Sequence, residues 1–189
     1  QYDAAARLIH DIRSTILSEK NRPITIVATP GNHDCNFLEN SQVRQLLLES
    51  LENKSTIALD TTTIDACTEI QREFFKFRDT LEEDNNAHGD KLWRTTQIET
   101  EQRKIAIESL NLSWCSKLKE QPGKLIFPVE SYADINPDEY DIRISNIHHP
   151  FNWISQQNYR PLRKKLRSIS HIIISGHEHE GNVGIIDEA

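Results

Sequence analysis

Five of the eight histidines fall in three short motifs. His33 lies in PGNHDC, His148 and His149 lie in NIHHPF, and His177 and His179 lie in SGHEHE. Residues i and i+2 of an extended segment point to the same face, so His177 and His179 can reach a common point. By itself, a His-x-His pair can bind a metal ion, bind a phosphate group, or form an exposed turn without a ligand.

The other two motifs favour a metal site. Each motif directly follows an apolar run that we expect to be a strand, and open α/β sheets form their sites at the carboxyl ends of strands. Three strands that end at one edge would bring these histidines into a single polar pocket. Imidazole suits Zn, Fe and Mn, and oxygen ligands from neighbouring Asn and Asp make such a site more suitable for hard cations.

The segments that position these motifs alternate between helical and extended patterns. Apolar residues at helical spacing predict helices in residues 1–17, from near Ser41, in 68–83 and in 159–169. Short apolar runs predict strands in residues 24–29, 104–114, 140–150, 171–176 and 182–187, of which 24–29 and 171–176 are expected to be buried. The polar segment 82–90 is expected to be a surface loop. This mixture predicts one α/β domain over residues 1–189.

The motifs together, in the order GNHD, His-His-Pro and Gly-His-x-His, resemble the calcineurin-like metallophosphoesterases. That family's pattern is DxH, GDxxD, GNH(D/E), a single His and GHxH, and this chain carries the last three of these elements. The resemblance spans residues 2–182, with no family motif in residues 60–140. It implies an α/β sandwich of two mixed sheets flanked by helices, here without the N-terminal βαβ part.

The resemblance also assigns metal ligands. It implies that Asn32, His148 and His177 bind one divalent ion and that His179 binds a second. Mn²⁺ is the expected metal, with Fe, Zn and Mg as alternatives. His149 receives no role, because on a continuing strand its side chain would point away from that of His148, which favours a structural role.

Two further residues are catalytic in this interpretation. The resemblance places His33 at the leaving group, where a histidine with a near-neutral pKa can supply a proton. It places Asp34 behind His33, where a carboxylate would hold the second ring nitrogen.

The reaction that the resemblance implies is hydrolysis of phosphate esters, with phosphodiesters favoured. Two cations about 3.5–4 Å apart, bridged by a hydroxide, clamp the oxygens of an in-line displacement. Because DxH and GDxxD are absent, residues 1–189 alone are expected to hydrolyse little. The alternative, from another class, is a catalytically inactive binding or regulatory module that retains the fold.

Charge and composition limit the partners. A net charge of −7 argues against a general nucleic-acid-binding surface. The basic run in residues 160–167 is the exception, and it is either a solvated helix face or a phosphate contact. No apolar run is long enough to cross a membrane.

The cysteines and the first residues bear on compartment and length. Three distant cysteines without a CxxC pair indicate neither a zinc ribbon nor a disulfide framework, which predicts a reducing, cytoplasmic setting. The chain has no Met and opens inside a predicted helix. We therefore expect it to belong to a longer, multidomain protein.

Overall fold

The chain has an α/β fold built around one mixed sheet. The structure is a computed structural model, and it describes residues 1–21, 23–52, 60–83, 85–132 and 135–178. Within these ranges the strands are β1 (Asn86–Gly89), β2 (Trp93–Glu99), β3 (Lys104–Leu110), β4 (Ile142–Ile147) and β5 (Ile172–Ser175). The α-helices there are α1 (Tyr2–Lys20), α2 (Gln42–Glu52), α3 (Thr61–Thr68), α4 (Arg72–Leu81) and α5 (Gln156–Ile169).

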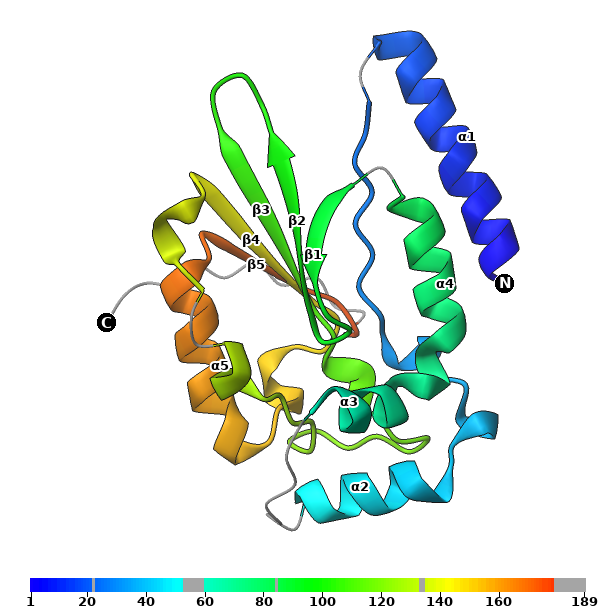
Figure 1. The fold of residues 1–189 in the computed structure, drawn as a ribbon, viewed down its shortest axis with the longest axis vertical. Helices are drawn as coiled ribbons and strands as arrows, with labels where there is room; N and C mark the ends of the chain where they lie inside the picture. Colours follow the sequence, from blue (N-terminus) through cyan, green and yellow to red (C-terminus); the bar gives the residue numbers. More distant parts are fainter. Residues whose placement is uncertain (22, 53–59, 84, 133–134, 179–189) are drawn as a thin grey trace.

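The order of the strands determines where their ends meet. The sheet has the order β1-β2-β3-β4-β5, in which β1, β2 and β3 are antiparallel neighbours. β3, β4 and β5 run parallel, with α5 as the crossover between β4 and β5. The carboxyl ends of these three strands therefore lie at one edge of the sheet. α5 lies on one side of the sheet, and α1 and α4 lie on the other (Figure 1).

The apolar core lies between the sheet, α5 and the short helices near the carboxyl edge. The largest fully buried apolar side chains are Trp114, Phe127, Leu92, Leu110, Leu112, Ile147, Leu162 and Leu166. Trp114 donates its Nε1–H to the Ile126 carbonyl at 2.8 Å, so its one polar atom is satisfied. This packing anchors the loops that follow β3 and β4.

The inner face of the sheet also carries a buried ion pair. Glu108 of β3 and Arg143 of β4 are in contact and almost fully buried. The second carboxylate oxygen of Glu108 accepts hydrogen bonds from Trp93 Nε1 at 2.7 Å and Thr95 Oγ1 at 2.6 Å. Buried charges need such partners, and these bonds join β2, β3 and β4 in one register.

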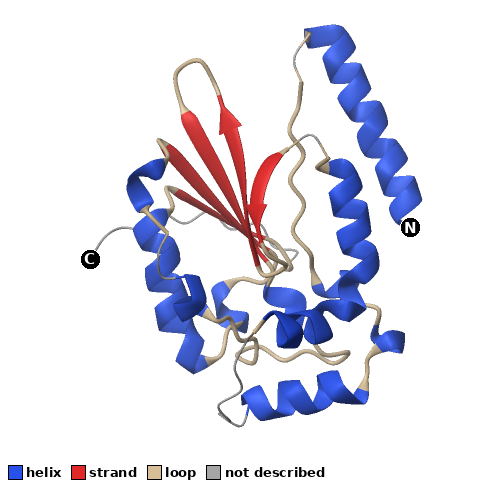
Figure 2. Ribbon diagram, viewed as in Figure 1, coloured by secondary structure: helices blue, strands red, loops and turns tan. Residues whose placement is uncertain are grey.

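The predicted strand in residues 24–29 is wrong, and so is the expectation of two sheets within the described residues. This segment is extended but runs beside the sheet as a loop (Figure 2). Its backbone bonds to side chains: Ala28 N–H donates to Glu82 Oε1 at 2.8 Å, and Asn85 Nδ2 donates to the Ile26 carbonyl at 2.8 Å. These partners replace the neighbouring strand that the apolar pattern predicts.

Other elements differ in detail. The predicted helix in 68–83 is interrupted by a 3₁₀ turn, Glu69–Gln71, between α3 and α4. The expected surface loop 82–90 contains β1, which pairs with β2. In the turn between them, Asp90 Oδ1 accepts hydrogen bonds from the backbone N–H groups of Leu92 and Trp93. β5 is exposed rather than buried, with half of Ile172 and Ile174 accessible. The predicted strand in 182–187 lies outside the described residues.

The predicted helices α1, α2 and α5 are confirmed. β3 and β4 are also present but are shorter than predicted, because β3 ends at Leu110 before the 3₁₀ turn Leu112–Cys115 and β4 spans only Ile142–Ile147. α1 has no buried residue, although its apolar stripe includes Leu8, Ile12 and Leu17. The three cysteines are free and buried, as expected without a disulfide framework. In the described part of the chain, no helix combines the length and the apolar character needed to span a bilayer.

Candidate metal centre

The parallel strands β4 and β5 bring two motif histidines together. His148 directly follows β4, and His177 lies two residues after β5. His177 Nδ1 is 3.2 Å from His148 Nε2. His177 has a left-handed backbone, with φ of +67°, which is uncommon for a residue other than glycine. Three features thus coincide at this edge: adjacent strand ends, a tight turn and two facing imidazoles.

Asn32 reaches the same point from a distant part of the chain. It opens a 3₁₀ turn, η1 (Asn32–Asp34), and its Oδ1 is 3.1 Å from His148 Nε2. Two bonds fix the preceding segment, one to β4 and one to the 3₁₀ turn after β3: Asn146 Nδ2 donates to Thr29 Oγ1 at 2.8 Å, and Ser113 Oγ donates to the Pro30 carbonyl at 3.1 Å. These contacts place the turn over the end of β4.

Gly31 allows the close approach of this turn to His148. A Cβ atom at position 31 would lie 2.7 Å from His148 Cε1, closer than any side chain tolerates. The glycine is therefore required by packing against the imidazole. Gly176, by contrast, has room for a Cβ at 3.6 Å from His148 Nδ1.

The surroundings keep both histidines neutral. Burial, together with His149 and His177, lowers the pKa of His148 to about 4. Burial and His149 also lower the pKa of His177. A neutral imidazole has a lone pair that can bind a cation. At neutral pH these two rings therefore bind a cation without first losing a proton.

His149 lies in the same cluster, which the sequence argument missed. Its ring centroid is 4.9 Å from that of His148 and 4.4 Å from that of His177. Because β4 ends at Ile147, the alternation of a strand does not extend to residue 149, and the predicted opposite orientation is wrong. Pro150, which directly follows, was the sequence signal that the strand ends early.

Glu120 is the second residue of the site without a sequence signal. Its Oε2 is 3.3 Å from His149 Nε2, and its other oxygen is buried with no hydrogen-bond partner among the described residues. Burial is the largest single influence and opposes ionisation, but His149, Ser116 and His177 together outweigh it and hold the pKa of the Glu120 carboxyl below its usual value. A buried carboxylate therefore lies directly behind the cluster.

His33 and Asp34 lie beside the cluster and are not paired with each other. His33 is exposed. Both oxygens of Asp34 have other partners: Tyr2 OH donates to Oδ1 at 2.7 Å, and Gly31 N–H donates to Oδ2 at 2.8 Å. The expected bond from Asp34 to His33 is replaced by these two, so Asp34 fixes the turn that carries Asn32.

The residues present fit a divalent cation. A ring nitrogen from each of His148, His149 and His177 lies within 4.8 Å of the others, which within the described ranges is the one such group of His, Cys, Asp or Glu. Asn32 adds an amide oxygen, and Glu120 adds a nearby negative charge. His179, the expected ligand of a second ion, lies outside the described residues.

A hollow of about 400 Å³ lies beside the turn that carries Asn32 and includes His33 and Asp34. It is lined by Gln1, Tyr2, Asp3, His33, Asp34, Cys35, Asn36, Ile70 and Glu73. Three of these side chains are acidic and none is Lys or Arg. The hollow therefore offers no lysine or arginine side chain to attract an anionic ligand.

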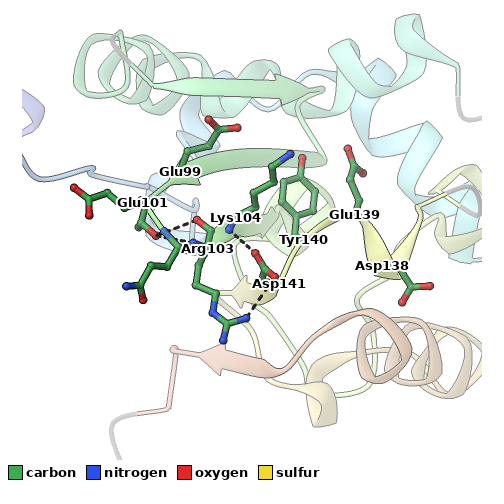
Figure 3. A pocket seen from close by; sticks show the side chains of 10 residues that line it. Glu99, Glu101, Arg103, Lys104, Asp138, Glu139, Tyr140 and Asp141 are labelled. Carbon is green, nitrogen blue, oxygen red and sulfur yellow. Dashed lines mark hydrogen bonds and ion pairs between the residues drawn. The ribbon is translucent and has the colours of Figure 1, made fainter.

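A second hollow, about 460 Å³, lies at the opposite end of the sheet (Figure 3). It is lined by residues 99–104 and 138–141, from the β2–β3 turn and the approach to β4. Asp141 accepts from Lys104 N–H at 2.7 Å and pairs with Arg103 at 3.5 Å. Its one arginine is paired with Asp141, and none of the three histidine motifs lines it.

The basic run of α5 forms a third surface feature. A hollow of about 470 Å³ is lined by Tyr159, Arg160, Arg163, Lys164 and Arg167. Arg163 donates to Tyr159 OH at 3.2 Å. This face is separate from the residues of the cluster.

Comparison with protein-family models, with curated proteins and with solved structures finds no match to this chain. The interpretation of the site therefore rests on its own geometry and on the three motifs.

Proposed function

We propose that this protein is a metal-dependent phosphoesterase of the calcineurin-like type that favours phosphodiesters. The observation that carries the proposal is the convergence of Asn32 Oδ1 and His177 Nδ1 on His148 Nε2, at 3.1 and 3.2 Å. Three motifs far apart in the sequence supply these atoms. The same motifs, in the same order, carry the resemblance to that family.

The ligand set agrees with the proposed chemistry. Divalent ions at this edge would neutralise the phosphate charge and activate a water molecule. Asn32, His148 and His177 would bind one ion, and His179 a second. A cation would assist substrate binding as well, because the hollow beside His33 contains three acidic side chains and no Lys or Arg side chain.

His33 has the position of a proton donor to the leaving group. It is exposed, it lines the hollow next to Asn32, and it makes no hydrogen bond among the described residues. A general acid of this kind acts on the alkoxide that departs from phosphorus. Asp34 supports the reaction indirectly, by fixing the turn that holds Asn32 and His33.

The test is hydrolysis of bis-p-nitrophenyl phosphate and p-nitrophenyl phosphate in the presence of Mn²⁺. We expect a slow reaction in residues 1–189 alone, faster for the diester than for the monoester, and we expect His148→Ala to lower the rate by about 100-fold or more. His10→Ala, a change on the exposed side of α1, is the matched control. Equal rates for wild type and His148→Ala would refute the proposal.

A second candidate is a binding or regulatory module that does not catalyse. It is favoured by the neutrality of Asn32, His148 and His177, since Mn²⁺ prefers charged oxygen ligands. On this view the 189-residue chain binds Zn²⁺ more tightly than Mn²⁺ in calorimetry and turns over neither ester. Two tight Mn²⁺ sites would contradict this candidate, because carboxylates other than those of the motifs would then have to bind the ions.

A further inference from the structure

His149 has the surroundings of a metal ligand rather than of a packing residue. Its side chain is completely buried, yet both ring nitrogens face polar atoms. Nδ1 is 3.4 Å from Ser113 Oγ, and Nε2 is 3.3 Å from Glu120 Oε2. Burying an imidazole between two polar groups is costly unless its hydrogen bonds are well satisfied.

The two neighbours decide which nitrogen of His149 carries the proton. The single hydroxyl proton of Ser113 is donated to the Pro30 carbonyl at 3.1 Å, so it does not go to His149. The Glu120 carboxylate can only accept, so its contact of 3.3 Å with Nε2 requires an Nε2–H donor. We assign this tautomer to the neutral ring of His149; its Nδ1 then keeps a lone pair, which faces Ser113 Oγ at 3.4 Å without a hydrogen bond and can be given to a cation.

A carboxylate behind a histidine is the arrangement that orients metal-binding imidazoles. The carboxylate fixes the tautomer and raises the basicity of the ring, and the free nitrogen binds the ion. The side chain of Glu120 is 8% exposed, and its Oε1 has no partner in the described part of the chain. A cation at the histidine cluster would offset this buried charge.

We propose that His148, His149 and His177 form a three-histidine site for a Zn²⁺-like ion, with Glu120 as the positioning residue of His149. The site shares His148 and His177 with the proposed function but does not require phosphoesterase activity. It assigns roles to His149 and Glu120, which the three-motif interpretation leaves without one.

The distances agree with zinc. Tetrahedral Zn–N bonds of about 2.0–2.1 Å place neighbouring nitrogens about 3.3 Å apart, and His148 Nε2 and His177 Nδ1 are already 3.2 Å apart. Ring nitrogens of all three histidines lie within 4.8 Å of one another, and binding would draw the His149 nitrogen closer to the other two. The Asn32 oxygen then becomes the weaker contact, because Zn²⁺ accepts nitrogen donors readily.

Calorimetry with Zn²⁺ distinguishes this three-histidine site from the motif site, which is the set of Asn32, His148 and His177 that the three motifs imply. Glu120→Gln keeps the size of the side chain and removes its charge, and we expect it to weaken Zn²⁺ binding by about 10–100-fold. His149→Gln should weaken binding further, and Asn32→Ala should weaken it least. His10→Gln is the matched control. If Asn32→Ala is more damaging than His149→Gln, the ion occupies the motif site and the proposal is wrong.

X-ray absorption of the Zn²⁺-loaded wild type decides the matter even if a buried substitution prevents folding. Three imidazole ligands are expected, and two would overturn the proposal. Failure of the proposed function is distinguishable, because a chain with three imidazoles on zinc and no esterase activity would contradict that function alone. Hydrolysis that depends on His148 in a chain whose zinc has two imidazoles would contradict the three-histidine site alone.

Discussion

His33 differs from the other motif histidines in what surrounds it. His148, His149 and His177 contact one another, whereas His33 is exposed beside the acidic hollow and makes no hydrogen bond among the described residues. A residue that does not touch the cluster can be changed without removing a ligand. Its contribution to turnover is therefore separable from metal binding.

His33→Ala should lower turnover by about 100-fold while the metal stays bound, because general acid catalysis contributes about 10²–10⁴-fold. The measurement pairs hydrolysis of bis-p-nitrophenyl phosphate with the metal content of the dialysed protein. His88→Ala, at an exposed position on β1, is the control. Loss of metal from the His33 variant would show that His33 is a ligand and not a proton donor.

The pKa of His148 predicts how stability depends on pH in the metal-free protein. Burial and the neighbouring His149 and His177 lower its pKa to about 4 in the folded state, against about 6.5 in an unfolded chain. Between these values the unfolded state binds more protons, so stability falls as the pH is lowered from about 6.5 to about 4.

Urea unfolding in a chelator at several pH values between 4 and 7 measures this slope. His148→Gln should flatten it, because glutamine does not titrate, and exposed His10→Gln should leave it unchanged. Identical slopes for wild type and His148→Gln would mean that His148 is protonated alike in both states.

At the scale of elements, Arg44 joins the helices beneath the site. It is 1% exposed, and its guanidinium donates to the carbonyls of Cys67 at 2.7 Å, Trp114 at 2.9 Å and Ser116 at 2.9 Å. These bonds connect α2 to α3 and to the 3₁₀ turn Leu112–Cys115. That turn carries Ser113, which contacts both Pro30 and His149.

Arg44→Met should lower the free energy of unfolding by about 3 kcal/mol, since three buried carbonyls lose a charged donor. Chemical denaturation measures the change. Arg7→Met, on the exposed face of α1, is the matched control and should change stability by less than about 0.5 kcal/mol. Similar values for the two variants would show that water replaces the guanidinium.

Apolar periodicity in the sequence predicts the elements that carry the histidines, but it does not predict contacts that depend on tertiary partners. β4, α5 and β5 follow clear apolar periodicities, and parallel pairing then places His148 and His177 together. Residues 24–29 have the composition of a strand, but their partners are the side chains of Glu82 and Asn85. Glu120 gave no signal, because only the fold brings it to His149, 29 residues away.

At the scale of the whole molecule, one face of the sheet is apolar and incompletely covered. Ile172 and Ile174 of β5 are 50% and 52% exposed. The strand register places Ile172 beside Ile144 of β4, and Ile144 beside Ile107 of β3. Ile144 and Ile107 are both partly exposed. The outer edge of β5 has no partner strand among the described residues. Apolar faces and open edges of this kind promote association.

We therefore expect the 189-residue chain to self-associate through this face, and Ile172→Lys with Ile174→Lys to reduce the association. Full burial of an isoleucine contributes about 1.5–3 kcal/mol. Because each side chain is already half buried, the pair contributes about 2 kcal/mol, which corresponds to a dissociation constant more than tenfold higher in the double variant. Sedimentation over a range of concentrations measures this constant. Leu38→Lys, at an almost fully exposed and separate position, is the control for added charge. If the Leu38 variant dissociates as much as the double variant, net charge rather than the isoleucine face governs the association.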